Sequence, residues 1–321
     1  MSINTPTSAP AGVQFVKISR DLAGQRIDNF LLNRLKGAPR SLIYRILRRG
    51  EVRVNKGRTK PDYRLKAGDT LRIPPVRLPE RRKVTPGERV LAQLERAIIH
   101  EDRQLLILNK PSGLAVHGGS GMNYGVIEGL RALRPDAPYL ELVHRLDRDT
   151  SGCLLIAKKR SALRRLHELL RNNEIDKRYL ALVKGQWQGG KRTVDAPLRK
   201  NVLRSGERIV RVDDTGKAAR SVMRPLATAD TASLIEIKLE TGRTHQARVH
   251  AATIGYPIAG DEKYGDRNFN QLLRTMGLKR LFLHARALTF RLNENEPAIS
   301  VIAPLPEELQ QLLQKLELAS D

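Results

Sequence analysis

The arrangement of short strand patterns in the C-terminal two thirds of the chain most constrains its fold. Two segments are apolar runs with polar edges and two alternate apolar with polar residues: LLILNK (105–110), CLLIAKK (153–159), YLALVKGQW (179–187) and ASLIEIKLE (232–240). Leucines at helical spacing occur in residues 161–172 and 306–318. Because helices are few between the strands, strict β–α–β alternation is absent. We therefore predict an α+β fold with a mixed, largely antiparallel sheet and helices packed against it.

A compact basic unit precedes this region. Residues 20–66 hold 14 Lys and Arg against 4 Asp and Glu. Segments 26–35 and 41–49 have helical spacing, and in the second helix Arg45, Arg48 and Arg49 fall on the arc opposite the aliphatic residues. Short strands are expected at 51–55 and 70–73. The pattern predicts a small α/β domain with one face buried and the other facing phosphates.

The domain boundaries follow from composition. Residues 1–19 have neither the charged nor the apolar region of a signal peptide, and we expect a disordered tail. The small basic domain is assigned to 20–75. Residues 76–95 combine prolines with a basic cluster, which is typical of a linker. The main domain is assigned to 96–321.

Net charge indicates the partner. The formal charge is +24 over 321 residues, and a chain this basic is expected to bind a polyanion, above all nucleic acid. No apolar run approaches the ~18 residues of a spanning helix, so no membrane is expected. Cys153 is the single cysteine, so an internal disulfide is impossible and a reducing cytoplasm is expected.

Two segments could carry chemistry. LVHRLDRDTSGCLLIA (142–157) places a polar turn with Asp147 between two apolar runs, where a sheet would hold it against a cleft. A charged hairpin with Asp149 and Thr150 as turn residues is the alternative. In the second segment, 240–265, arginines and histidines are closely spaced. An arginine from this segment near Asp147 would favour its ionised form, but the residues alone do not show that the segments meet.

Metal chemistry is not expected. His245 and His250 are five residues apart without a helical HExxH pattern, so a zinc site is not indicated. Asp147 and Asp149 could suggest a two-metal nuclease. No further acidic cluster supports that, and the flanking arginines would compete with metal ions.

Four motifs in order resemble those of the RluA-type pseudouridine synthases. They are LNKPSGLAVH (108–117), HRLDRDTSG (144–152), KRYLALVKG (177–185) and TGRTHQARVH (241–250). The basic unit resembles the small RNA-binding domain named after ribosomal protein S-four. The resemblance implies a pseudouridine synthase fold and conversion of specific uridines to pseudouridine in large-subunit (23S) ribosomal RNA, at more than one site.

The resemblance also assigns roles. Asp147 matches the family's catalytic aspartate, Tyr179 the tyrosine proposed to remove the ring-carbon proton, and Arg248 the basic partner of the aspartate. Arg145 matches the arginine that occupies the space of the flipped uridine. In the first motif, Lys110 has an open role, structural or functional. The RNA-binding candidates of the basic unit are Arg40, Arg45, Arg48, Arg49, Arg53, Lys56 and Lys60.

Further expectations follow from the reaction. It conserves atoms and exchanges no electrons, so no cofactor is needed, and we expect a monomer acting on ribosomal RNA. Asp147 acts either as a nucleophile or as a base, and the sequence does not choose. A non-enzymatic RNA-binding or ribosome-assembly factor would explain the charge but not the motif residues. A metal-dependent ribonuclease would lose activity in EDTA.

Overall fold

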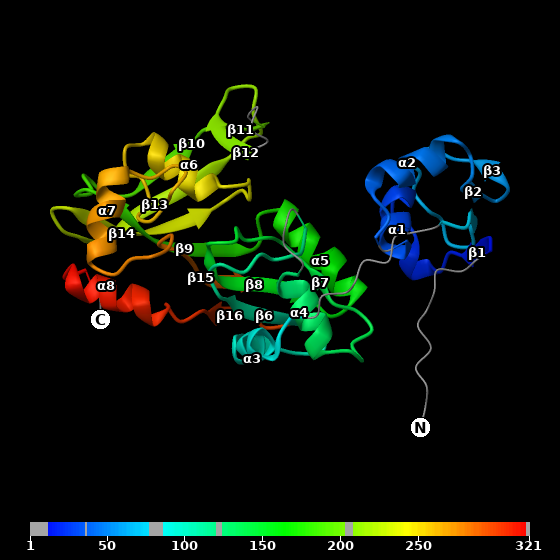
Figure 1. Cartoon of the computed structure of the whole chain (residues 1–321), viewed down its shortest axis with the longest axis horizontal. Coiled ribbons are helices and arrows are strands. Elements are labelled where there is room, and N and C mark those ends of the chain that lie inside the picture. The colour runs from blue at the N-terminus through cyan, green and yellow to red at the C-terminus, as the bar shows by residue number, and fades with distance from the viewer. Residues whose placement is uncertain (1–11, 36, 77–85, 120–123, 203–207, 319–321) are drawn as a thin grey trace. The chain divides into compact units, whose positions relative to one another are not determined.

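The structure, a computed structural model, describes residues 12–35, 37–76, 86–119, 124–202 and 208–318 (Figure 1). The chain divides into two compact units, residues 1–83 and 84–321. Each unit has a hydrophobic core of its own.

The N-terminal unit packs two α-helices against a four-stranded antiparallel sheet of order β1-β4-β2-β3. Its elements are β1 (Gln14–Lys17), the 3-10 helix η1 (Arg20–Leu22), α1 (Ile27–Arg34), α2 (Arg40–Arg48), β2 (Arg53–Val54), β3 (Gly57–Arg58) and β4 (Thr70–Ile73). The two predicted faces of the second helix are confirmed: Ile43, Ile46 and Leu47 are buried, whereas its arginines are exposed.

Two expected boundaries differ from the structure. The expected tail, 1–19, contains β1, which pairs with β4 and is therefore part of the folded unit; residues 1–11 lie outside the described residues. The expected linker, 76–95, contains most of helix α3 (Glu88–Arg96). The nearby prolines obscured this helix, which buries Leu94 in the core of the second unit. Residues 77–85 of that segment lie outside the described residues.

The second unit is built on a mixed ten-stranded sheet, counted over its described residues. The main order is β10-β13-β14-β9-β15-β8-β6-β5, with β16 beside β15 and β7 beside β8. Every pairing is antiparallel except β15 with β8, so the predicted largely antiparallel sheet is confirmed. The strands are β5 (Ile98–Glu101), β6 (Leu105–Lys110), β7 (Glu141–Leu142), β8 (Ser151–Ala157), β9 (Asp176–Lys184), β10 (Arg192–Asp195), β13 (Arg220–Thr228), β14 (Ala232–Leu239), β15 (Leu283–Phe290) and β16 (Ile299–Ile302).

Helices cover this sheet, and a separate hairpin extends from it. Figure 1 shows α4 and α5 beside β6 and β8, and α6 and α7 beside β13 and β14. Besides α3, the helices are α4 (Val126–Leu133), α5 (Arg160–Arg171), α6 (Gln246–Thr253), α7 (Arg267–Thr275) and α8 (Glu307–Lys315). The hairpin pairs β11 (Leu198–Val202) with β12 (Arg208–Val212). No helix of the described ranges is both long and apolar enough to cross a bilayer.

The strand register places the predicted site residues. Gly152 of β8 pairs with Ala285 of β15, Ala285 with Tyr179 of β9, and Tyr179 with Ile237 of β14. These four residues therefore form one row across the sheet. Because β14, β9, β15 and β8 are successive neighbours in the sheet, the loop before β8 and the helix α6 after β14 come close to each other. Residues distant in sequence can therefore face one cleft.

Candidate active site

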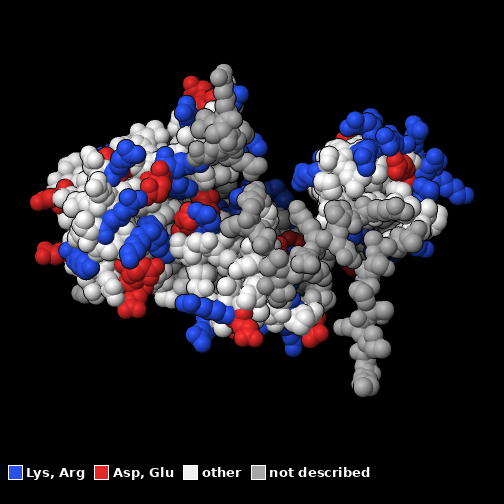
Figure 2. Space-filling view, viewed as in Figure 1, with Lys and Arg blue, Asp and Glu red and all other residues white. Residues whose placement is uncertain are grey.

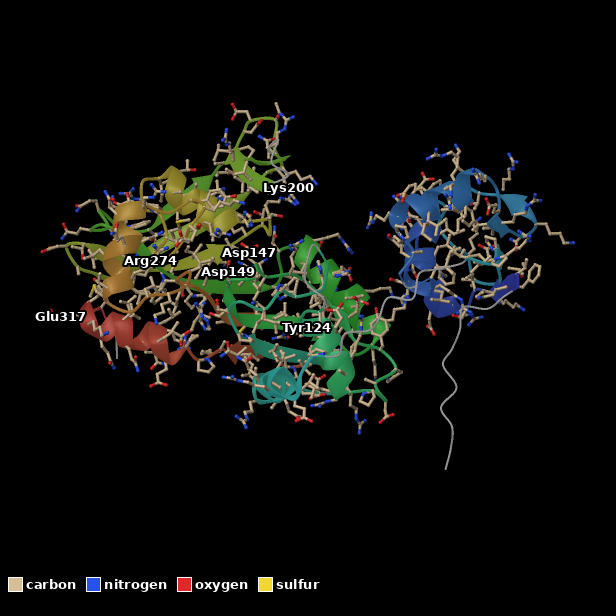
Figure 3. All side chains as sticks on the ribbon, viewed as in Figure 1. Tyr124, Asp147, Asp149, Lys200, Arg274 and Glu317 are labelled. Carbon is tan, nitrogen blue, oxygen red and sulfur yellow. The ribbon has the colours of Figure 1, made fainter. Side chains whose placement is uncertain are left out.

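Asp147 lies on the loop between β7 and β8 (Figure 3). Two strands that pair with each other hold the ends of this loop. Within it, the backbone N–H of Thr150 donates to the carbonyl oxygen of Asp147 at 3.2 Å, which closes a turn. The Asp147 side chain is 20% exposed and lines a cleft. The predicted polar turn before a buried strand is thus present.

Close contact with β15 fixes the start of β8. Gly152 has φ +106°, and a Cβ there would lie 2.3 Å from the carbonyl oxygen of Ala285, so only glycine fits. Beside it, Ser151 shares a hydrogen bond of 2.9 Å with buried His284 and accepts one of 2.7 Å from Arg280. The strand that follows Asp147 therefore begins at a fixed place.

Buried Lys110 holds the same loop from the other side. Its Nζ donates to the carbonyl oxygens of Pro111, Leu114 and Arg148 at 2.7, 2.8 and 2.9 Å. Burial, with the charge of Arg280, lowers the pKa of Lys110 to about 7. The three acceptors match the three N–H bonds of an ammonium group, which a neutral amine lacks. We infer that this contact set favours the charged form, and that the role of Lys110 is structural.

Arg248 joins two carboxylates. It projects from α6, and its Nη1 lies 3.2 Å from Oδ2 of Asp147. Its Nε and Nη2 donate to both oxygens of Asp261 at 2.7 and 2.8 Å. Burial alone would lower the pKa of Arg248, but hydrogen bonds and charge from Asp261, then from Asp147, raise it. The segments that sequence reasoning could not connect do meet, and Arg248 is a permanent cation beside Asp147.

Asp261 is a site residue that sequence reasoning missed. Its side chain is 1% exposed, and besides Arg248 it accepts from the backbone N–H groups of Lys263 and Tyr264 at 2.9 and 3.0 Å. Burial opposes its ionisation, but the Arg248 hydrogen bonds outweigh burial and keep the Asp261 pKa below its usual range. The carboxylate orients Arg248 toward Asp147. The one sequence signal was the acidic pair Asp261 and Glu262 directly after Gly260.

His245 also faces Asp147. Its Nε2 lies 3.7 Å from Oδ2 of Asp147, and its Nδ1 is 2.8 Å from the hydroxyl of Tyr264. Burial is the main cause that lowers the pKa of His245, although the charge of Asp147 opposes it. Sequence reasoning considered His245 only as a zinc ligand and so missed this contact.

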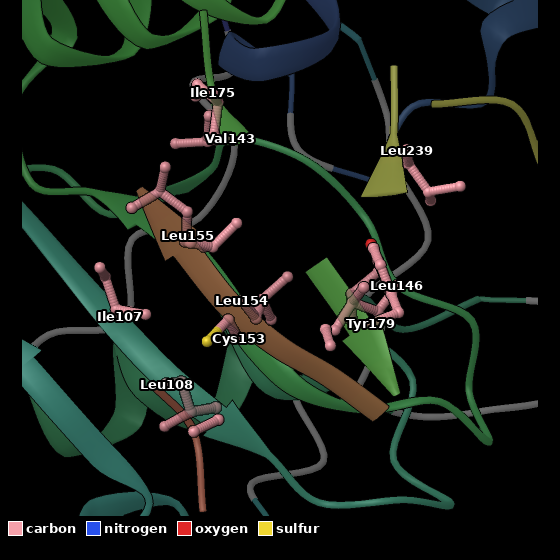
Figure 4. Packing of buried hydrophobic residues seen from close by; sticks show 14 of the residues in the cluster. Ile107, Leu108, Val143, Leu146, Cys153, Leu154, Leu155, Ile175, Tyr179 and Leu239 are labelled. Atoms are coloured by element: carbon pink, nitrogen blue, oxygen red, sulfur yellow. The ribbon is translucent and has the colours of Figure 1, made fainter. Parts of the chain in front are cut away.

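Tyr179 lies in the packed core beneath the loop. It is 8% exposed and belongs to the same buried cluster as Leu146, and Figure 4 shows the two side chains in that packing. Burial, followed by the charge of Asp147, raises its pKa well above the usual value for a phenol. The phenol is therefore within the electrostatic range of Asp147 but is not among the residues that line the open cleft.

The cleft itself is large and rich in cations. Its volume is about 1290 Å³, above the usual range for small-molecule pockets. Arg145 is exposed on its wall, and no hydrogen bond or ion pair joins its guanidinium to another described residue. Other basic residues of the lining are Arg96, Arg148, Lys263, Lys279 and Arg280. These charges suit a phosphate backbone better than a neutral ligand.

The seven RNA-binding candidates all belong to the N-terminal unit. Each is exposed there, and Figure 2 shows basic side chains gathered over the part formed by α2, β2 and β3. Some are engaged locally: Arg49 lies 3.9 Å from Glu51, and Arg53 donates to the carbonyl oxygens of Gly50 and Lys56. All seven therefore lie on the surface of this unit.

Metal binding finds little support in the side chains present. Over the described ranges, no three or more His, Cys, Asp or Glu side chains are grouped so that they could hold a metal ion. At the cleft, each carboxylate near Asp147 is already matched by arginine. The donor set therefore suits ion pairing rather than metal binding.

Comparisons with known proteins agree with this geometry. The profile of the family described as RNA pseudouridylate synthase matches residues 104–253, and that of the S4 domain matches residues 25–71. The ribosomal large subunit pseudouridine synthases C of Salmonella typhimurium and Escherichia coli K12 are each 57% identical to this chain, over 97% of it and 98% of their own length. The synthase C of Pasteurella multocida is 55% identical over 94% of this chain and 93% of its own.

Two solved structures share the fold. Human RNA pseudouridylate synthase domain containing 4 has a TM-score of 0.59 and 27% identity, covering 71% of this chain and 95% of that one. Human RNA pseudouridylate synthase domain containing 1 has a TM-score of 0.56 and 25% identity, covering 74% and 99%. Three of the four motifs line one cleft, and the relatives are matched over nearly their full length. The chain therefore belongs to the RNA pseudouridylate synthase family and is an RNA pseudouridine synthase.

Proposed function

We propose that this enzyme converts specific uridines to pseudouridine in large-subunit (23S) ribosomal RNA, at more than one site. The observation that carries the proposal is the pairing of Asp147 with Arg248 in a cation-lined cleft, in a chain 57% identical to proteins named for that reaction. The substrate is free RNA or RNA in a partly assembled subunit.

Asp147 is the proposed reacting group. In the reaction the bond from N1 of uracil to C1′ breaks, the base turns, a bond from C5 to C1′ forms, the C5 proton leaves and N1 gains a proton. As a nucleophile, Asp147 would form an ester at the sugar, which the turned base then displaces. As a base, it would remove a sugar proton and later return it. Both routes use the carboxylate form, to which Arg248 presents a positive charge at 3.2 Å.

Arg145 is proposed to act before the reaction of Asp147 at the sugar, and Tyr179 after it. The target base leaves its stack at a cost of a few kcal/mol, and Arg145, exposed on the cleft wall, offsets this by bonding in the vacated space. Tyr179 takes the C5 proton. The raised pKa of Tyr179 keeps its phenol protonated, so the phenol accepts the C5 proton only while it donates its own proton to another base. Asp147 is the proposed acceptor, because its charge contributes to the raised pKa of Tyr179.

The N-terminal unit, assigned as the RNA-binding domain 20–75, supplies affinity. Its seven exposed cations are proposed to bind backbone phosphates, which fix position without reading sequence. We further propose that the enzyme works as a monomer, since one chain supplies all the site residues named here. The cytoplasm is the proposed location because the relatives' named substrate is ribosomal RNA and Cys153 is a buried free thiol. No cofactor is required.

The test uses purified full-length protein and a 23S RNA transcript with 5-tritiated uridine. Tritium release, with the modified positions mapped by sequencing, is expected with the 23S transcript and not with a small-subunit transcript of matched length. Tritium release should persist in EDTA. A metal-dependent ribonuclease would instead cleave the RNA and would lose that activity in EDTA. Binding to RNA without tritium release would indicate an assembly factor and overturn the proposal.

A further inference from the structure

Two side chains approach the same oxygen of Asp147. Arg248 Nη1 lies 3.2 Å and His245 Nε2 3.7 Å from Oδ2. Both groups line the same cleft as the Asp147 side chain. Oδ2 therefore has a guanidinium and an imidazole beside it.

The backbone of His245 is held in an uncommon conformation to reach this place. Its φ is 55° and its ψ 18°, in the left-handed region, where a residue with a Cβ pays about 1–2 kcal/mol. It occupies the N-cap of α6 but makes no side-chain cap. Strain of this kind persists where the surroundings enforce it, and it collects at functional sites.

Gln246 enforces this turn. Its Oε1 accepts from the backbone N–H of Arg243 at 3.0 Å and from the hydroxyl of Thr241 at 2.6 Å. Its Nε2 donates to the carbonyl oxygen of Arg220 at 2.9 Å. A buried amide with both ends engaged locks the backbone just after His245, and so directs the imidazole away from capping and toward Asp147.

Tyr264 sets the ring of His245. The backbone N–H of Val210 donates to its hydroxyl oxygen at 2.9 Å, which leaves the phenol proton for Nδ1 of His245 at 2.8 Å. The imidazole then carries its own proton on Nε2, the nitrogen that faces Asp147. The same Tyr264 ring lies 5.1 Å from the guanidinium of Arg248, so it supports both groups that face the carboxylate.

We propose that His245, oriented by the hydroxyl of Tyr264, is a positioning residue that, together with Arg248, sets the orientation of the Asp147 carboxylate in the cleft. This rests on the proposed function, because it assigns a role within that reaction. In this role His245 acts through Asp147. With Arg248 and His245 both beside Oδ2, rotation of the carboxylate is restricted, which keeps it aimed at the sugar in every turnover.

Four variants test the proposal, with kcat and KM measured separately on the 23S transcript. His245→Asn keeps a residue that tolerates the left-handed region but is too short to reach Oδ2. His245→Gln keeps an amide N–H of greater reach. Tyr264→Phe keeps the ring beneath Arg248 and removes only the hydroxyl. The fourth variant combines His245→Asn with Tyr264→Phe.

His245→Asn should lower kcat by roughly 10- to 100-fold, the range for groups that orient a reacting side chain, with KM unchanged. His245→Gln should recover part of that loss. Tyr264→Phe should lower kcat in the parent protein but not further in the His245→Asn background, because it acts through His245. The control is Tyr256→Phe, whose hydroxyl accepts from Gln188 outside the cleft and whose loss should leave kcat unchanged.

Three outcomes would overturn the inference alone: kcat unchanged in His245→Asn, a loss confined to KM, or additive losses in the double variant. If His245→Asn does not fold, Tyr264→Phe and His245→Gln still decide, since both must lower kcat without moving KM. A wild-type protein that forms no pseudouridine would instead overturn the proposed function and this role with it.

Discussion

The buried ammonium of Lys110 donates a 2.9 Å hydrogen bond to the carbonyl oxygen of Arg148, the residue that follows Asp147. The catalytic loop is thus tied at its backbone to the end of β6, the strand that pairs antiparallel with β8. Loop position and sheet are coupled through this contact, so a residue that never reaches the reacting atoms can control where Asp147 lies.

Lys110→Met should weaken both fold and catalysis. The substitution keeps the stem but leaves buried carbonyl oxygens without their donor, which costs at least about 1–3 kcal/mol of unfolding free energy. Urea unfolding and kcat on 23S RNA measure the two effects. Lys184→Met, which removes a half-exposed lysine paired with Asp266, is the control and should change neither by a similar amount. Equal stability of the two variants would contradict a structural role for the Lys110 hydrogen bonds.

Asp147→Asn should reduce tritium release by at least roughly 100-fold, whether the carboxylate acts as base or nucleophile. The fold should persist, because Arg248 keeps its bidentate partner Asp261. Asp149→Asn is the matched control from the same loop, since Asp149 pairs with exposed Arg148 and should cost far less. Near-normal turnover by Asp147→Asn would remove it from the mechanism.

Asp261→Asn should destabilise the protein in a pH-dependent way. It leaves Arg248 buried without its main partner, which costs about 3–5 kcal/mol at neutral pH. Because the pKa of Asp261 is lowered in the folded state, its contribution is complete above the ordinary carboxyl value of 3.8 and is lost as pH falls below it. The difference in unfolding free energy between wild type and variant should therefore shrink from pH 7 toward pH 3.

The control for this prediction is Glu262→Gln, which removes the neighbouring carboxylate, 70% exposed and paired with Arg274. Its unfolding free energy should match wild type within about 1 kcal/mol at every pH. A wild-type-to-Asp261→Asn difference that stays constant down to pH 3 would show that the Asp261 pKa is not lowered.

Arg145→Ala should impair base flipping more than chemistry. If the guanidinium fills the vacated space, its removal leaves the cost of unstacking and unpairing the target base, a few kcal/mol, without compensation. Turnover should therefore fall more on a base-paired target than on an unpaired oligonucleotide with the same uridine. Arg96→Ala, at another exposed arginine of the cleft lining, is the control. An equal loss on both RNAs would argue against the flipping role.

Neutralising α2 should reduce the salt dependence of RNA binding. Replacing Arg45, Arg48 and Arg49 with Gln removes three exposed cations, and each cation that pairs with a phosphate contributes about 0.7–0.9 to the slope of log K against log salt. The slope should therefore become shallower in the triple variant. A salt series of binding measurements on a 23S fragment reads this out. Turnover at saturating RNA should stay near wild type, because the catalytic unit is untouched.

The matched control replaces three other exposed arginines of the same unit, Arg20, Arg34 and Arg64, with the same loss of charge. A uniform effect of net charge would lower the slope equally in both triple variants. That result would contradict a defined phosphate-binding face on α2.

Local patterns in the sequence were sufficient for most elements. Alternating and apolar runs predicted β6, β8, β9 and β14, and the spacing of Ile43, Ile46 and Leu47 predicted the buried side of α2. They succeed because a helix or strand repeats every few residues, so its buried face is written locally. Helix α3 was missed because prolines beside it are typical of linkers, while the burial of Leu94 depends on distant partners.

The candidate site divides in the same way. By its own pattern the sequence determined a polar turn carrying Asp147, a basic α/β unit and a polyanion partner, and family motifs added Tyr179, Arg145 and Arg248. The motifs implied that Arg248 is the partner of Asp147, but only the tertiary structure showed the contact across 101 residues of chain. Only the tertiary structure, too, decided that Asp261, His245 and Lys110 support the pair. The physical reason is that strand order and register set which loops meet, and burial sets each charge; neither repeats locally in the sequence.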